Sequence, residues 1–194
     1  VVAGVSAMVA RTGYTGEDGF ELFVPAEAAD HVWASLTVAG EGHGLVAAGL
    51  AARDSLRLEA GMPLYGNELD RSTTPYNAQL GRTVRLDKTT DDGEYVPFVG
   101  REALAARATS TPASVLVGLE GTGRRAARHG YRVLQGEAPV GYVTSGAPSP
   151  TLGRPIAMAY VTPEVTAPGT ELSVDVRGRL EPVRVVELPF YRRQ

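Results

Sequence analysis

The chain has 194 residues, a formal net charge of −3, and 43% apolar and 21% charged residues. This balance is typical of a globular protein with one large or two small domains, and the small charge gives no electrostatic reason to expect nucleic acid or an anionic membrane as a partner. The chain has no cysteine, which excludes disulfides, thiolate zinc sites and a cysteine nucleophile.

The chain begins with Val1 inside a strand-like pattern rather than with methionine, so we expect an incomplete polypeptide. Its longest nearly apolar run, residues 44–52, is too short to span a bilayer. No positively charged start followed by an apolar stretch marks export. Together with the lack of cysteine, these features predict a cytoplasmic protein.

A hairpin is the first element that the pattern predicts. Residues 5–11 and 20–24 are strand-like, and they flank the stretch RTGYTGEDGFE, in which glycine recurs at positions 13, 16 and 19. A helix is expected over residues 25–36, where apolar residues recur at helical spacing. We expect Trp33 and the apolar face around it to belong to the core.

A second helix is predicted over residues 50–60, because apolar positions alternate there with charged ones at helical spacing. Gly61 and Pro63 end it. Further along the chain, residues 81–86 predict a strand and residues 100–108 a short helix.

The pattern changes after residues 109–114, a polar stretch with a proline and no periodicity that we interpret as a linker. Beyond it, short apolar runs are separated by Gly, Pro, Asp and Ser, which predicts an antiparallel β-barrel or sandwich of about six strands. We therefore predict an α+β first part with a partial mixed sheet and helices over residues 1–108, and an all-β C-terminal domain over residues 112–194.

The sequence argues against several common kinds of site. It contains neither the phosphate-binding pattern G-x-x-x-x-G-K-[ST] nor a strand-led G-x-G-x-x-G, and no G-x-S-x-G elbow. His31, His43 and His129 are isolated, without the spacing of metal ligands. We therefore expect no metal, no nucleotide site and no catalytic triad.

Several long motifs, read in chain order, are informative together. They are RTGYTGEDGFEL (11–22), AARDSLRLEAGMPLYGNEL (51–69), FVGREAL (98–104), RHGYRV (128–133), GYVTSGAPSPTLG (141–153), IAMAYV (156–161) and LPFYRR (188–193). In this order they closely resemble the glycine cleavage T-protein family of tetrahydrofolate-dependent aminomethyltransferases. The match runs through nearly all of the chain and covers roughly the C-terminal half of that family.

The resemblance implies an activity and its participants. Members of the family transfer the methylene carbon of an aminomethyl group on the lipoyl arm of H protein to the co-substrate tetrahydrofolate, and they release ammonia. The family's principal catalytic candidate, an aspartate, lies in the half that has no counterpart here. The resemblance therefore implies part of a folate site, a lipoyl-bearing H protein as partner, and a chain that is inactive alone.

Three residues match family positions that bind folate. Glu21 matches the pterin-binding glutamate, and a carboxylate can accept hydrogen bonds from both the amino group and the ring N–H of a pterin edge. Tyr14 matches a tyrosine that lines the pocket, although it could equally anchor the hairpin. Arg53 matches a folate-contacting arginine and would pair with the pterin carbonyl or a carboxylate of the glutamate tail.

Further positions are assigned to the border of the site. Gly13, Gly16 and Gly19 are expected to shape the pocket wall, through positive φ or by leaving room for close approach. We expect Tyr65 either beside the cavity or in a loop whose side chains form hydrogen bonds with their own backbone. We expect Arg192 either near the glutamate tail of folate or in a frayed terminus.

Three nearby charged residues receive lower weight. We rank Arg57, one helical turn after Arg53, below that residue as a folate contact. Glu17 and Asp18 are expected only to solvate the turn.

Two alternatives remain open at this stage. The chain could be the folate module of a dimethylglycine- or sarcosine-oxidising enzyme or of a folate-dependent demethylase, which an upstream flavin-binding segment would reveal. It could also be a non-catalytic, folate-binding regulatory protein, which would bind pterin without transferring a one-carbon group.

Overall fold

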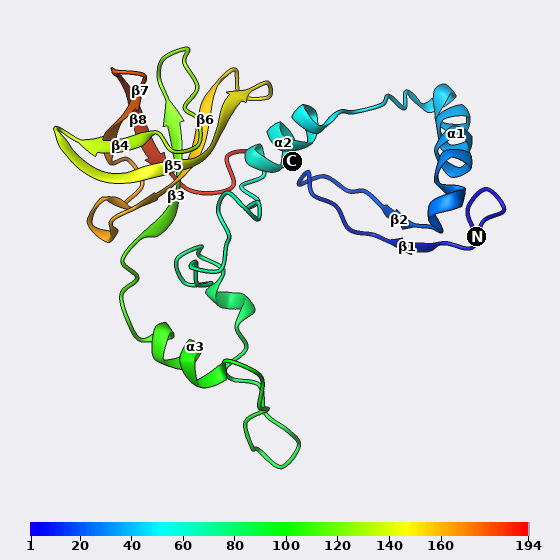
Figure 1. Cartoon of the computed structure of the whole chain (residues 1–194), viewed down its shortest axis with the longest axis horizontal. Coiled ribbons are helices and arrows are strands. Elements are labelled where there is room, and N and C mark those ends of the chain that lie inside the picture. The colour runs from blue at the N-terminus through cyan, green and yellow to red at the C-terminus, as the bar shows by residue number, and fades with distance from the viewer. Residues whose placement is uncertain (194) are drawn as a thin grey trace.

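The computed structural model describes residues 1–193, and it shows two unequal ends and a third segment, which carries α3 (Arg101–Ala108), projecting from between them (Figure 1). A β-hairpin and helix α1 lie at one end, and a β-barrel lies at the other. Helix α2 lies between them, and the C-terminal segment returns to this helix. This placement makes α2 the element on which both parts of the chain converge.

The first end is the predicted hairpin followed by the predicted helix. Strands β1 (Met8–Ala10) and β2 (Glu21–Phe23) pair antiparallel, with Val9 opposite Leu22. A 3₁₀ turn over Ala26–Ala28 leads into α1 (Ala29–Gly40), which a second 3₁₀ turn over Glu41–His43 follows. The sheet of this part is confined to the two short strands of the hairpin.

The prediction that Trp33 belongs to the core is wrong, since its residue is 64% exposed. In α1 the buried residue is its neighbour Val32. Consecutive helical residues point about 100° apart, so a single narrow contact can bury one of them and leave the next in solvent. Other large apolar side chains of this end are also exposed, among them those of Met8, Phe20, Phe23, Leu36 and Val38.

The middle of the chain contains two of the predicted helices but not the predicted strand. Helix α2 covers Leu50–Glu59, and α3 covers Arg101–Ala108. Residues 81–86, predicted as a strand, begin with a 3₁₀ turn over Gly81–Thr83. The backbone N–H of Thr83 donates to Leu80 O at 2.9 Å. Local turn bonds of this kind satisfy the backbone there without a partner strand.

The second end is a closed barrel of six antiparallel strands, as predicted, in the order β3-β6-β5-β4-β7-β8. The strands are β3 (Val115–Gly121), β4 (Arg132–Gln135), β5 (Ala138–Ser149), β6 (Arg154–Val161), β7 (Glu171–Val176) and β8 (Arg179–Val186), with a 3₁₀ turn over Pro163–Val165. Closure gives every strand two neighbours and leaves no open edge.

Two apolar clusters cover the two faces of the barrel wall. The inner cluster fills the barrel with small and branched side chains, including those of Val117, Val143, Ala159, Val174 and Val185. The outer cluster joins helix α2 to the wall through Leu58, Leu116, Ile156, Met158 and Tyr160, with Leu188 and Phe190 of the C-terminal segment packed against it. Strand β6 contributes to both clusters, which explains why seven of its eight residues are buried. The outer cluster fixes α2 on the barrel.

Candidate functional site

Helix α2 carries a buried arginine that contacts two other segments of the chain. The Arg57 side chain is fully buried and forms an ion pair with the fully buried Glu68 carboxylate, Nη1 to Oε2, at 3.0 Å. Its Nη2 donates to Ser145 Oγ of β5 at 2.8 Å, and its Nε donates to Asp54 Oδ1 at 2.8 Å. The Asn67 amide also donates to Ser145 Oγ, at 3.0 Å. One guanidinium therefore joins α2, residues 62–68 and the barrel.

A second buried carboxylate joins the end of α2 to the turn between β5 and β6. Glu59 is 3% exposed, and it accepts hydrogen bonds from the Ser149 hydroxyl and from both N–H and Oγ1 of Thr151, the latter two at 3.0 and 2.7 Å. A carboxylate in the last turn of a helix opposes the helix dipole. Its three hydrogen bonds to the barrel offset that cost and fix the end of α2.

The tip of the hairpin also meets helix α2. The Arg53 guanidinium lies over the Tyr14 ring, with 4.6 Å between its carbon and the ring centroid. The Tyr14 hydroxyl donates to Pro63 O at 2.5 Å. Partial burial raises the pKa of the Tyr14 phenol, although the charges of Arg57 and Arg53 act to lower it. The phenol is therefore a neutral hydrogen-bond donor at neutral pH.

The glycines of the hairpin do not have equal roles. Gly16 adopts a left-handed φ of +75°, and a Cβ added there would lie 2.7 Å from Ala60 Cβ at the end of α2. Gly13 and Gly19 lie outside the left-handed region, and a Cβ would meet open space at Gly19. The expected positive φ or close approach is therefore found at Gly16, where the hairpin touches the helix.

The C-terminal segment approaches the same place from the barrel. The Tyr191 backbone N–H donates to Glu59 O at 2.9 Å, and Arg193 Nη1 lies 3.2 Å from Glu17 Oε2. Arg192, between them, is exposed. The hairpin tip, the end of α2 and the C-terminal segment thus form a contiguous surface around Tyr14 and Arg53.

Two expectations about the turn charges are wrong. Asp18 forms a two-bond pair with Arg11, in which both oxygen–nitrogen distances are 2.9 Å. This pair holds the pKa of the Asp18 carboxyl below its usual range. Glu17 pairs with Arg193 from the far end of the chain. Both carboxylates therefore have specific partners and do more than solvate the turn.

Glu21 lies where the connecting loop of the hairpin enters β2, rather than at the tip of that loop. It is the first residue of β2, opposite Ala10, and its carboxylate accepts a hydrogen bond from the Thr12 hydroxyl. The residue is exposed, so the carboxylate is available to a ligand. Tyr65 is 71% exposed, on the segment after α2. The structure brings Tyr14 and Arg53 into contact, and it places Glu21 on the hairpin that carries Tyr14.

The buried polar residues around α2 were the part that sequence reasoning missed. The sequence ranks Arg57 below Arg53 as a folate contact and predicts no role for Glu59 or Glu68. A signal was present in LRLEAG, where two charged residues flank a leucine in the last turn before a glycine. A glutamate at a helix C-terminus is unfavourable unless it has a partner elsewhere.

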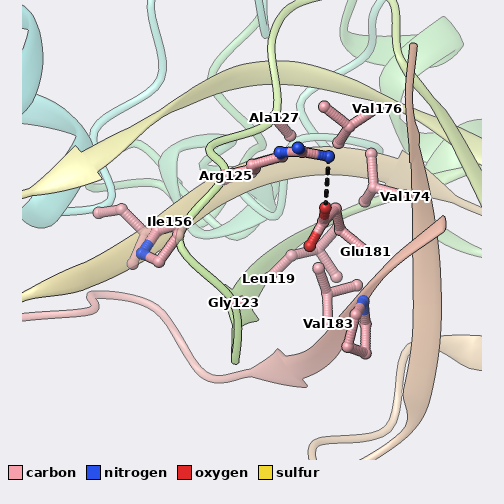
Figure 2. A pocket seen from close by; sticks show the side chains of 13 residues that line it. Leu119, Gly123, Arg125, Ala127, Ile156, Val174, Val176, Glu181 and Val183 are labelled. Carbon is pink, nitrogen blue, oxygen red and sulfur yellow. Dashed lines mark hydrogen bonds and ion pairs between the residues drawn. The ribbon is translucent and has the colours of Figure 1, made fainter. Parts of the chain in front are cut away.

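A small pocket at one end of the barrel is separate from this surface. It is lined mainly by apolar residues, among them Leu119, Ala127, Ala157 and Val174 of the inner cluster. Figure 2 shows Arg125 and Glu181 facing each other there. Their side chains form an ion pair at 3.4 Å. Within residues 1–193, no group of three or more His, Cys, Asp and Glu side chains is arranged to hold a metal ion. Over the same residues, no helix is both long enough and apolar enough to cross a membrane.

Comparison with known proteins gives consistent matches along the chain. Residues 1–88 match the family model described as the GCVT N-terminal domain, and residues 115–192 match the glycine cleavage T-protein C-terminal barrel domain. An aminomethyltransferase of Streptomyces coelicolor is 62% identical over all of this chain and 51% of its own length. One of Saccharopolyspora erythraea is 60% identical over 99% of this chain and 51% of its own.

A solved structure agrees with these matches. The crystal structure of glycine cleavage system aminomethyltransferase T from Bartonella henselae superposes with a TM-score of 0.84 at 36% identity. It covers 94% of this chain, which in turn covers 49% of that one. The chain therefore spans about half the length of the relatives it matches.

Proposed function

Because this chain belongs to the glycine cleavage T-protein family, we propose that it is part of an aminomethyltransferase and forms one wall of its tetrahydrofolate site. The complete protein would transfer the methylene carbon of the aminomethyl group on lipoyl H protein to tetrahydrofolate and release ammonia. The chain alone would be inactive, since positioning of both reactants supplies much of the rate of such a transfer.

The observation that carries the proposal is the contact between Tyr14 and Arg53. The ring and the guanidinium come from positions far apart in the sequence, and they lie 4.6 Å apart on a surface that the chain leaves accessible at Arg53. A planar pterin can stack on an aromatic ring and accept hydrogen bonds from a guanidinium. An exposed arginine such as Arg192, nearby on the C-terminal segment, suits the anionic glutamate tail of folate.

We assign Glu21 the role of binding the hydrogen-bonding edge of the pterin ring. A carboxylate that already accepts one bond from Thr12 keeps acceptor capacity for the amino group and the ring N–H of the pterin. Gly13, Gly16 and Gly19 shape the turn that leads from Tyr14 to Glu21, and Tyr65 is assigned to the rim of the cavity.

Binding of 5-formyltetrahydrofolate to the complete protein that includes these residues tests the assignment. Glu21→Gln should weaken binding in a calorimeter by roughly ten- to a hundredfold, because it replaces a charge-assisted pair with a neutral one. Glu27→Gln, an exposed glutamate of the 3₁₀ turn after the hairpin, is the control and should bind like the wild type.

A transfer assay separates the enzyme from a folate-binding protein without activity. Formation of methylenetetrahydrofolate from aminomethylated lipoyl H protein is expected for the complete protein and not for residues 1–194 alone. Folate binding without transfer by the complete protein would contradict the enzymatic assignment, and an unchanged affinity of Glu21→Gln would contradict the placement of the pterin.

A further inference from the structure

The buried polar residues behind the site form a continuous connection from the barrel to Tyr14. The connection starts at Ser145 of β5, whose hydroxyl accepts from Arg57 at 2.8 Å. Arg57 then binds Glu68 at 3.0 Å and the Met62 carbonyl at 3.2 Å. Both Arg57 and Glu68 side chains are fully buried, so neither can touch a ligand on the surface.

The same pair shapes residues 62–68, which hold the tyrosine. Glu68 Oε2 accepts a hydrogen bond from the Leu64 backbone N–H at 2.9 Å as well as from Arg57. The pair therefore binds the backbone on both sides of Pro63, at Met62 O and at Leu64 N. Pro63 O, fixed between them, accepts the Tyr14 hydroxyl at 2.5 Å.

The Arg57–Glu68 pair also affects the position of Arg53, whose guanidinium lies over the Tyr14 ring. Arg53 lies one helical turn before Arg57 on α2. Because residues four apart lie on the same side of a helix, an anchor at Arg57 also orients Arg53. A buried ion pair adds little net stability compared with apolar residues of the same size. Its hydrogen bonds, however, define one geometry, and a binding site needs its contacting groups held to within about half an ångström.

We propose that the buried Arg57–Glu68 pair is a positioning unit, which holds the Pro63 carbonyl and helix α2 so that the stack of Tyr14 and Arg53 presents a flat face to a fused bicyclic heteroaromatic ring. The inference rests on the proposed function for the identity of that ring, the pterin of tetrahydrofolate. The pair itself does not contact the ligand.

The test combines a ligand-free signal with an affinity. In the complete protein that includes these residues, the NMR resonance of isotope-labelled Tyr14, assigned with Tyr14→Phe, reports the position of the ring without folate. The affinity for 5-formyltetrahydrofolate reports the surface offered to the ligand. Both are measured well below the thermal unfolding midpoint of each variant.

Arg57→Lys keeps the charge but loses the branched set of donors that reaches Ser145, Met62 and Glu68 together. It should shift the Tyr14 resonance and weaken folate binding roughly tenfold or more, since small displacements of a positioned group have effects of this size. Arg154→Lys is the matched control, because Arg154 pairs with Glu120 on the barrel surface at 3.1 Å, and it should change neither signal.

Ser145→Ala removes the hydroxyl that joins Arg57 to the barrel. If Arg57→Lys does not fold, the Tyr14 resonance and the folate affinity of Ser145→Ala test the proposal instead. A lower unfolding midpoint with an unchanged Tyr14 resonance and unchanged affinity would show a merely structural pair and overturn the proposal. A shifted resonance with unchanged affinity would overturn it too. If the wild type binds no folate while Arg57→Lys still shifts Tyr14, the proposed function fails and the positioning of Tyr14 by the pair stands.

Discussion

The two ends of the molecule use apolar residues in opposite ways. The barrel buries its apolar side chains in two clusters, and several of them, such as Val143 and Met158, are fully enclosed. The hairpin and α1 leave Phe23 and Trp33 more than half exposed. The contrast shows that apolar spacing along a strand or helix predicts the element but does not establish that another element covers it.

Closure explains the difference. Each barrel strand has two hydrogen-bonded neighbours, whereas the hairpin consists of two three-residue strands with open edges. A two-stranded hairpin is marginally stable by itself in water, and three or more strands or a packed helix are needed for independent stability. The barrel should therefore determine the global free energy of unfolding of this chain. The hairpin should be ordered only while it is packed against the rest of the chain.

The largest expected effect falls where the two regions meet. Arg57→Ala leaves Glu68 as a buried carboxylate without its cation, and it should lower the free energy of unfolding by about 3 to 5 kcal/mol. Chemical denaturation measures the loss. Replacing both residues with methionine should recover much of it, because no buried charge then remains. No recovery in the double variant would contradict this account.

Core substitutions should separate the two ends directly. Met158→Ala, at a position with no exposure, should lower the free energy of unfolding by about 2 to 5 kcal/mol. Trp33→Ala, at a position that is 64% exposed, should change it by no more than about 0.5 kcal/mol in spite of the larger side chain. Denaturant titration of both variants provides the comparison. Equal losses would mean that Trp33 is covered in solution.

The contact of the hairpin tip with α2 can be weakened on its own. Gly16→Ala combines a left-handed φ of +75° with a Cβ placed 2.7 Å from that of Ala60, and the backbone term alone should cost about 1 to 2 kcal/mol. Gly19→Ala is the control in the same turn, since its Cβ would meet open space. Amide hydrogen exchange should show faster opening of the hairpin in Gly16→Ala, with barrel protection unchanged.

The smallest effects concern one surface ion pair at each end. Arg11 at the hairpin and Arg132 at the barrel hold the pKa values of Asp18 and Asp175, respectively, below the usual range. Each pair therefore contributes fully above the unfolded-state pKa of aspartate, and its contribution is lost as the pH falls through the lower, folded-state value. Carboxyl NMR titration measures both values.

Arg11→Gln sharpens this comparison, because it should raise the Asp18 pKa and leave that of Asp175 unchanged. The two carboxylates belong to different ends of the molecule, which makes Asp175 an internal reference. A raised Asp175 pKa in this variant would show that the ends are electrostatically coupled, contrary to expectation.

Local sequence patterns were sufficient for most elements of the fold. The hairpin, α1, α2, α3 and the six barrel strands each follow from apolar spacing and turn residues within a short window. Residues 81–86 and Trp33 were mispredicted for a common reason. Their local pattern is the same whether or not a second element lies against it. Within residues 1–193, no element pairs with residues 81–86 as a strand or covers Trp33.

The site divides in a similar way. Tyr14 and Arg53 were predicted by resemblance to a family, and the structure adds that they touch. The contact of Arg57 with Ser145 joins residues 88 positions apart, and that of Glu17 with Arg193 joins the two ends of the chain. Pairings of this range depend on the closed barrel and the path of the C-terminal segment, which spacing does not encode.

The return of the C-terminal segment to α2 has a consequence for the order of assembly during translation. Domains form as units while the ribosome still extends the chain. Residues 188–193 are synthesised after the hairpin, α2 and all six barrel strands. The bond from Tyr191 to Glu59 and the pair between Arg193 and Glu17 therefore cannot form until all six barrel strands have been synthesised. The surface around Tyr14, although it starts early in the sequence, is therefore not closed until residues 188–193 have been added.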